Sequence, residues 1–314
     1  MTQPLSDLTA QLLDLARKAG ADQADAIAVE GTSVSIDVRA GALEQAERSE
    51  GVDIGLRVLI GQRQANVSSS DTKPDTLRQM VERAIAMAKE APEDPYAGLA
   101  DVAQLAKSTD NSALELFDPS EEPDPAALQE DAARAEAAAL ENKGISQVQS
   151  ASAGYNKSRV HLSASNGFST GYARTSRGLS CVAISGTGTG MERDYDYDSR
   201  IFQSELRDAA DIGRIAAERA VERVGARKSK TGAYPVLFDE RISSSLIGHL
   251  LQATNGAAIS RGSSWLRDAL GEQVIAGLPE PVHVCRISDL AEPSGFSRRA
   301  FVGRLEERQI FESA

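Results

Sequence analysis

The sequence predicts an α+β protein in which an N-terminal helix and antiparallel-sheet domain is followed by a β-rich second domain. Apolar residues alternate without a break through 52–60, and apolar helix faces occur on both sides of this run. Prolines and acidic residues gather at 92–127, as in a segment between domains. With 314 residues, the chain is long enough for two domains of roughly 100–200 residues each.

The N-terminal domain is predicted at residues 1–95. Helical spacing of leucine and alanine begins it, and Gly20 is a suitable C-cap. Alternation with period two then indicates strands with one buried face, and Gly61-Gln62 is expected to turn the chain. The predicted elements are a helix at 5–19, an apolar run at 26–29, strands through 34–38, 52–60 and 65–67, and a helix from Pro74 to Ala88.

Residues 96–144 are predicted to be a proline-rich, acidic linker followed by an alanine-rich helix that Gly144 ends. The β-rich domain is predicted at 145–314. Asn166-Gly167 indicates a hairpin with a type I′ turn, which needs positive φ at both central residues. The other predicted features are a turn at Ser176-Arg177-Gly178, a strand through 179–183, a helix at about 209–225, a short buried strand at 236–238, and a helix through 242–251 that ends at Asn255-Gly256.

The composition narrows the function classes. The net charge of −12 disfavours broad contact with nucleic acid or with anionic lipid. No apolar run reaches about 18 residues, and the N-terminus lacks the pattern of a signal peptide, so we expect a cytoplasmic protein that neither spans nor binds a membrane. Cys181 and Cys285 lack metal-type spacing and are expected to be free, buried thiols.

The chain has few histidines, so it offers few possible ligands for a zinc ion. A zinc-hydrolase helix needs two histidines on one face with a glutamate beside them. The three histidines are His161, His249 and His283, on unrelated segments, and Leu250 rather than glutamate follows His249. The sequence therefore predicts no catalytic, cofactor-binding or metal-binding residue in this chain.

Three other patterns resemble functional motifs but have simpler structural interpretations. Asp194, Asp196, Asp198 and Glu205 fit positions of a calcium loop, but Ser199 stands where that loop needs glycine. A solvated acidic loop with its two tyrosines packed inward is therefore expected. The glycines at 186–190 lack the lysine and helix start of a nucleotide loop. The serines at 243–245 and 263–264 have no assignable histidine or aspartate partner, so hydroxyl-rich loops are expected there.

Several segments together resemble the TldD/PmbA family, also labelled modulator of DNA gyrase. The resemblance runs over about 5–280. The segments are Gly55-Leu56-Arg57-Val58, Ser165-Asn166-Gly167, 191–197, Thr231 to Asp239, the helix through 246–251, Gly262 to Leu266, and Leu270-Gly271-Glu272.

The resemblance implies a two-subunit metalloprotease that acts on unfolded polypeptides and small peptide precursors. In this family the TldD subunit holds zinc on a His-Glu-x-x-x-His helix, and the PmbA (TldE) subunit completes the chamber without those ligands. The corresponding helix here has Leu250 and Thr254 where glutamate and the second histidine would stand. This departure matches the PmbA side, so the resemblance implies a TldD-type partner that supplies the zinc.

The C-terminal segment departs from the family pattern. After about 282 the resemblance degrades, and family chains continue well beyond Ala314. A frameshift, an early stop or a shortened chain would each explain this. The expectation is an incomplete second domain whose open sheet edges invite aggregation.

Two hypotheses from different classes follow. The first is a subunit of a proteolytic complex, which supplies chamber walls where a peptide adds as a strand to a sheet edge. The partner's zinc would then perform hydrolysis. The alternative is a non-enzymatic regulatory or binding protein of the gyrase-modulator type, whose acidic surface contacts a basic protein.

Overall fold

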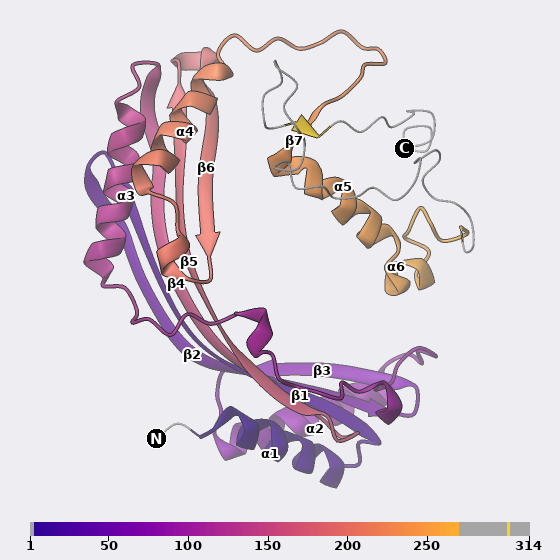
Figure 1. Cartoon of the computed structure of the whole chain (residues 1–314). Coiled ribbons are helices and arrows are strands. Elements are labelled where there is room, and N and C mark those ends of the chain that lie inside the picture. Colours follow the sequence, from indigo (N-terminus) through magenta and orange to yellow (C-terminus); the bar gives the residue numbers. More distant parts are fainter. Residues whose placement is uncertain (1–2, 270–299, 302–314) are drawn as a thin grey trace. The chain divides into compact units, whose positions relative to one another are not determined.

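The structure is a computed structural model that describes residues 3–269 and 300–301 (Figure 1). The chain divides into two compact units, residues 1–227 and residues 228–314. Each unit is described by itself. Among the described residues, no helix is long and apolar enough to cross a lipid bilayer.

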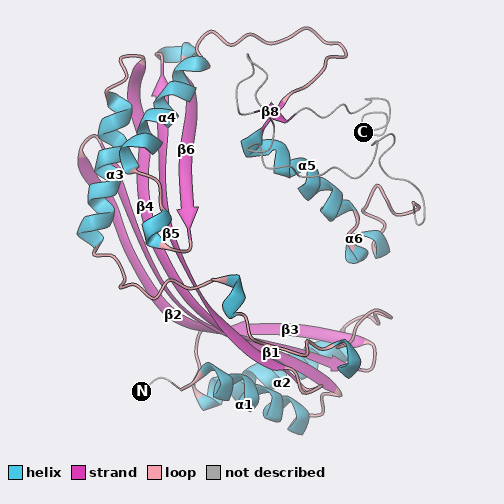
Figure 2. Cartoon of the chain, viewed as in Figure 1, coloured by secondary structure: helices cyan, strands magenta, loops and turns pink. Residues whose placement is uncertain are grey.

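The first unit is built on one antiparallel sheet of six strands in the order β3-β2-β1-β4-β5-β6, flanked by four helices (Figure 2). The four strands β1, β2, β4 and β5 are 17 to 20 residues long, and the sheet bends along their length (Figure 1). The elements are α1 (Leu5–Lys18), β1 (Gln23–Arg39), β2 (Ala42–Ile60), β3 (Arg63–Ser69), α2 (Pro74–Glu90), α3 (Pro125–Leu140), β4 (Ile145–Ala164), β5 (Ser169–Ser185), β6 (Glu192–Arg200) and α4 (Ala209–Glu222).

These elements follow from the apolar spacing. The α2 helix begins at Pro74, whose fixed φ suits a first helical turn, and buries one apolar face from Leu77 to Ala88. The N-termini of α3 and α4 are capped by Asp124 and Asp208, whose carboxylates accept hydrogen bonds from backbone N–H groups of the first turn. The helices predicted at 5–19, 74–88, 126–142 and 209–225 are thus confirmed within a few residues.

The helices cover one face of the sheet and form two apolar cores. The first core joins α1 and α2 to one end of β1, β2 and β3. The second joins α3 and α4 to β4, β5 and the other end of β1. Buried positions of β1 are even-numbered at both ends, from Ala24 to Val38, so both cores lie on the same face of the strand.

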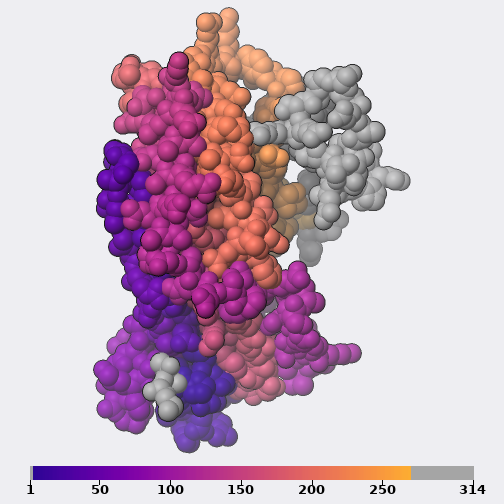
Figure 3. Space-filling view, turned by 60° about the vertical axis from the view of Figure 1, so that its left-hand side comes forward, coloured from indigo at the N-terminus to yellow at the C-terminus, as the bar shows by residue number. Residues whose placement is uncertain are grey.

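The two helices of the second core pack unusually closely. A side chain at Gly213 of α4 would collide with the backbone of Ala135 in α3. Figure 3 shows α3 and α4 side by side. Any residue larger than glycine at position 213 would therefore push the helices apart.

The compact units do not coincide with the segments 1–95, 96–144 and 145–314 predicted from the sequence. The reason is the pairing of β1 with β4, in which Asp25 lies opposite Ala164 and Val38 opposite Ala151. The end of the intervening segment is also packed: Leu116 O accepts from Thr175 N of β5, and Asp118 is buried. One sheet therefore includes strands that the sequence analysis assigned to two domains.

Two turn predictions need correction. The hairpin at Asn166-Gly167 is confirmed, but only Gly167 has positive φ, with φ 95°. The Gly167 N–H donates to Ala164 O, and Ala164 N–H donates to Phe168 O, so the loop is longer than a two-residue type I′ turn. No turn occurs at Ser176-Arg177-Gly178, which lies inside β5 because buried Arg177 pairs with Asp131 of α3 at 2.6 Å.

A type I′ geometry is found instead at the tip of the β1–β2 hairpin. Ala40 and Gly41 both have positive φ, 53° and 73°. Their N–H groups donate to the two carboxylate oxygens of Glu136, at 2.6 and 2.8 Å. Glu136 is itself only 2% exposed, so α3 holds this hairpin through a buried carboxylate.

The second unit contains β7 (Phe238–Asp239), α5 (Glu240–Ala253), α6 (Gly256–Ser260) and β8 (Ala300–Phe301). The helix predicted through 242–251 is confirmed as α5. The predicted buried strand at 236–238 is wrong, since Val236 and Leu237 are more than half exposed and only β7 is a strand. Helix α5 ends at Ala253, two residues before the predicted end at Asn255-Gly256, and Asn255 caps α6 through its side chain. Expectations for His283, Cys285 and the segment after about 282 lie outside the described residues, apart from β8.

Candidate functional site

The helix α5 carries the histidine that the sequence analysis weighed as a metal ligand. Its N-cap is Asp239, whose Oδ1 accepts from the backbone N–H of Arg241 at 3.0 Å. His249 is exposed on α5, and Leu250 follows it. The Thr254 hydroxyl donates to the carbonyl of Leu251 in the same helix, at 3.1 Å.

This helix does not fit a zinc ion. A catalytic zinc site takes three protein ligands, commonly imidazoles and a carboxylate. On α5, His249 supplies one imidazole, and the two positions that would complete the motif hold an aliphatic side chain and a hydroxyl bonded to its own helix. Among residues 3–269 and 300–301, no group of three or more His, Cys, Asp or Glu side chains could hold a metal ion. That this chain contributes no catalytic or metal-binding residue stays a prediction.

A second histidine, His161, belongs to a cluster of hydroxyls between α1 and the β4–β5 hairpin. Its Nδ1 lies 2.9 Å from Thr9 Oγ1, which lies 3.1 Å from Ser163 Oγ. Ser163 Oγ lies 3.2 Å from Ser169 Oγ across the hairpin. Thr9 is fully buried, so no substrate reaches it, and the cluster fastens α1 to β4. The sequence does not indicate this cluster, because Thr9 lies about 150 residues before the other members and no local pattern joins them.

A hollow of about 490 Å³ opens beside α1, next to the β4–β5 turn. Its charged side chains are Asp14, Arg17 and Asp22. Asp14 and Arg17 pair with each other at 2.6 Å, and Asp22 Oδ2 accepts from the Gly61 N–H at 2.8 Å. The Ser165 hydroxyl also lines it, but its Oγ accepts from the Ala24 N–H at 3.0 Å, and no histidine is among the lining residues to act as its base.

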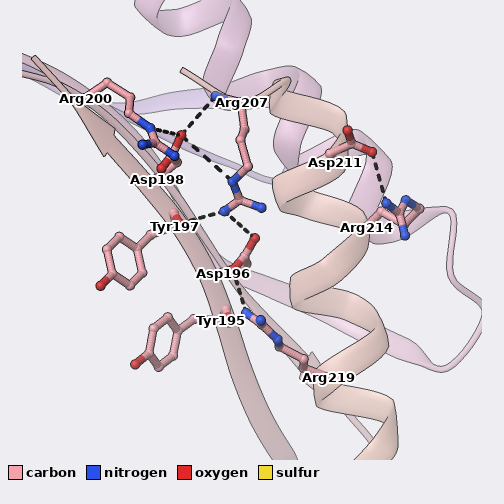
Figure 4. A network of polar contacts seen from close by, with 9 residues as sticks. All are labelled: Tyr195, Asp196, Tyr197, Asp198, Arg200, Arg207, Asp211, Arg214 and Arg219. Atoms are coloured by element: carbon pink, nitrogen blue, oxygen red, sulfur yellow. Dashed lines mark hydrogen bonds and ion pairs between the residues drawn. The ribbon is translucent and has the colours of Figure 1, made fainter. Parts of the chain in front are cut away.

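The richest polar arrangement lies between β6 and α4 (Figure 4). Asp194, Asp196 and Asp198 alternate with Tyr195 and Tyr197 along β6, and the three aspartate side chains are at most 10% exposed. In a strand, side chains two positions apart lie on the same face. The carboxylates therefore point toward α4 and the tyrosines away from it.

Arginines from α4, from the loop before it and from the end of β6 neutralise these carboxylates. Asp196 forms an ion pair through each of its carboxylate oxygens. Its Oδ1 lies 2.5 Å from Arg219 Nη1, and its Oδ2 lies 2.8 Å from Arg207 Nη2. Asp198 accepts from the backbone N–H of Arg207 at 3.0 Å and from Arg200 Nε at 3.1 Å. The contacts of Arg207 and Arg219 join β6 to the loop before α4 and to the last turn of α4.

Burial and hydrogen bonding act in opposite directions on Asp198. Burial alone raises the pKa of its carboxyl, but the hydrogen bonds from Arg207 and Arg200 outweigh burial and hold the pKa below its ordinary value. Asp198 therefore stays ionised, as the adjacent arginines require.

The expectation of a solvated acidic loop with inward tyrosines is wrong here. The residues form a strand, the aspartates face inward, and Tyr195 and Tyr197 are 40% and 55% exposed. Their rings stack with centroids 6.1 Å apart. The Asp-Tyr alternation has a period of two, and this signal could have identified the strand.

The same arginines also occupy the backbone edge of β6. Arg219 Nη1 donates to the Tyr195 carbonyl at 3.2 Å, and Arg207 Nη2 donates to the Tyr197 carbonyl at 2.7 Å. The Tyr195 N–H donates to Asp194 Oδ1 at 2.8 Å. Side chains thus take up hydrogen-bonding groups that an added strand at this edge would use.

Three family models match successive parts of this chain. Residues 24–88 match domain 1 of the PmbA/TldA metallopeptidases, residues 118–224 match the central domain, and residues 231–282 match the C-terminal domain. The last match includes α5.

Similar proteins agree with these matches. The chain is 33% identical to Metalloprotease PmbA of Escherichia coli O157:H7, over 86% of this chain and 60% of that protein. It is 32% identical to a Metalloprotease PmbA homolog of Haemophilus influenzae, over 87% of this chain and 60% of that protein. The chain thus spans about 60% of the length of these relatives.

Solved structures show the same fold. A protein described as a modulator of DNA gyrase from Bacteroides thetaiotaomicron matches with a TM-score of 0.77 and 24% identity, over 86% of this chain and 61% of that one. TldE from Thermococcus kodakarensis matches with a TM-score of 0.64 and 19% identity, over 82% of this chain and 57% of that one.

Proposed function

From the premise that this chain belongs to the PmbA/TldD family of metallopeptidases, we propose that it is a PmbA/TldE-type subunit of a two-subunit metalloprotease. Its partner is a TldD-type protein, and the complex hydrolyses unfolded polypeptides or peptide precursors in the cytoplasm. The zinc ion, bound by the partner, supplies the activated water and the Lewis acid for peptide hydrolysis.

The observation that carries this proposal is the composition of α5. Residues 231–282 match the C-terminal metallopeptidase domain, yet around His249 the helix offers a single imidazole. An aliphatic side chain at Leu250 cannot act as a general base. This composition supports a hydrolytic site whose zinc ligands and base come from another chain.

Co-expression with a TldD-type partner tests the proposal. The purified complex should hydrolyse an unfolded protein substrate, lose activity to a chelator and regain it with zinc, whereas this chain alone should be inactive. A matched partner variant with its zinc-binding histidines replaced should form the complex without activity. Zinc-dependent hydrolysis by this chain alone, with about one tightly held zinc ion, would overturn the assignment of zinc to the partner.

A non-enzymatic regulatory role is the alternative, favoured by the structural match to a protein described as a modulator of DNA gyrase. The net charge of −12 suits contact with a basic protein better than contact with DNA. Co-purification with gyrase subunits in the absence of peptidase activity would favour this alternative.

A further inference from the structure

The sheet of the first unit has one edge at β6 and the other at β3 and the part of β2 that β3 does not cover. The two edges differ in how far their backbone groups are free to bind another strand. At β6, arginine and aspartate side chains occupy backbone groups of Tyr195 and Tyr197. An incoming strand would have to displace Arg207 and Arg219 from both the carbonyls and Asp196. This edge is closed to strand addition.

The other edge is open along part of β2. Strand β3 pairs with β2 only from Ile54 to Ile60, whereas β1 pairs with β2 along nearly its whole length. Residues 42–53 therefore have a neighbouring strand on one side only. Residues 42–51 are exposed, and among the described residues no side chain or further strand bonds to their outer backbone groups. At 3.3 Å per residue this free edge is roughly 40 Å long.

The charges along this free edge are mainly acidic. Its basic side chain, Arg48, is already paired with Glu50 at 2.5 Å and with Glu122. Glu44 is paired with Arg39 of β1 at 3.3 Å. Glu47 and Asp53 are the remaining acidic side chains of this edge. Glu47 lies opposite Ser35 of β1, two residues from Asp37, so two carboxylates lie near each other on the face away from the helices. Two copies of this edge laid together would bring like charges into opposition, which is destabilising.

From these observations we propose that the free edge of β2, residues 42–53, docks an extended, basic segment of a partner polypeptide as an added strand. Main-chain hydrogen bonds would supply the affinity, and lysine or arginine side chains opposite Glu47 would supply the selectivity. This docking needs neither zinc nor a TldD-type subunit, so it goes beyond the function proposed above.

The experiment uses the full chain and a synthetic peptide of alternating lysine and threonine. Hydrogen exchange should slow at residues 42–53 when this peptide is added, and the β6 strand should be unaffected. A peptide of the same sequence with alternate backbone nitrogens methylated cannot donate along one edge and should give no protection. A glutamate–threonine peptide should also give none.

Two variants with the same change in net charge separate the edge from general electrostatics. Glu47→Lys should weaken binding of the basic peptide by about three- to tenfold, because an opposite-charge pair becomes a like-charge pair. Glu82→Lys, an exposed position on α2, should leave binding unchanged. Equal effects of both variants, or equal binding of the methylated peptide, would overturn the proposal.

Two further outcomes would also overturn it. One is the absence of protection at 42–53 with the basic peptide. The other is protection of these residues without peptide that grows with protein concentration, which would identify a second copy of this chain as the occupant. Because no TldD-type subunit is present, none of these outcomes bears on the zinc-dependent peptidase assay.

Discussion

Replacing Glu136 by glutamine should destabilise the first unit far more than its near-isosteric size suggests. Both Glu136 carboxylate oxygens accept N–H groups from the β1–β2 hairpin tip, at Ala40 and Gly41. Glutamine keeps one acceptor, but its amide NH₂ would face the other backbone N–H, which leaves a part-buried donor without an acceptor.

The expected loss can be worked from these contacts. A hydrogen bond to a charged group contributes about 1.5–3 kcal/mol, and a buried unsatisfied donor costs about 1–3 kcal/mol. Part of the second cost is relieved by movement of the exposed hairpin tip, so we expect a loss of about 2–4 kcal/mol in the free energy of unfolding. For a domain of this size, that corresponds to a fall in Tm of roughly 4–16 °C.

Urea denaturation followed by circular dichroism measures the loss, and hydrogen exchange at residues 39–42 locates it. Glu130→Gln, at an exposed position on the same helix, is the matched control and should change stability by less than about 0.5 kcal/mol. If Glu136→Gln is no more destabilising than Glu130→Gln, then the buried carboxylate does not hold the hairpin.

Three further predictions concern pH, proteolysis and thiol reactivity. Because the folded pKa of Asp198 lies below its unfolded value of about 3.9, its stabilising contribution is complete above that value and is lost as pH falls through the folded pKa. Acid unfolding between about pH 5 and pH 2 should therefore be shallower in Asp198→Asn, and an unchanged profile would contradict this. Limited proteolysis should cut first within 92–127, more narrowly at 101–115 because Leu116 is bonded to β5, and early cuts at 52–67 would refute the strand assignment. Burial raises the pKa of the Cys181 thiol to about 12, so iodoacetamide should modify it only in denaturant, and rapid native labelling would count against this burial.

Local patterns predicted most of the helices and strands. The alternation at 52–60 and the apolar faces of α1, α2 and α4 each place their own residues correctly, since burial of one face fixes the period. These signals lie within single elements. Apolar periodicity within a strand does not say which other strand pairs with it. For this reason the sequence did not predict the pairing of β1 with β4.

Buried charges caused the errors in the second half of the sheet. The polar sequence around Arg177 predicts a turn. Instead, Arg177 is buried inside β5, where its guanidinium pairs with Asp131 of α3. Asp196 resembles a solvated residue, but Arg207 and Arg219 approach it from segments later in the chain. Hydrophobic patterning places tyrosine inside and aspartate outside, and only knowledge of the arginine positions reverses that choice.

The sequence predicts the composition of the candidate site on α5 more directly than it predicts the sheet. The absence of glutamate and of a second histidine around His249 is a property of adjacent residues, so the sequence alone states it. By contrast, the closed edge of β6 and the open edge of β2 depend on which strands lie outermost. They became visible only with the sheet order.

The pairing of β1 with β4 also determines the order in which strands can pair while the chain is synthesised on the ribosome. The β1–β2 hairpin can close as soon as it has emerged, but β1 cannot pair on its other side until Ala151 to Ala164 have been made. At about 5–20 residues per second, the nascent chain waits several seconds with one long strand uncovered. During that interval a chaperone, or the earlier folding of α1 and α2 against the hairpin, would have to protect it from neighbouring chains.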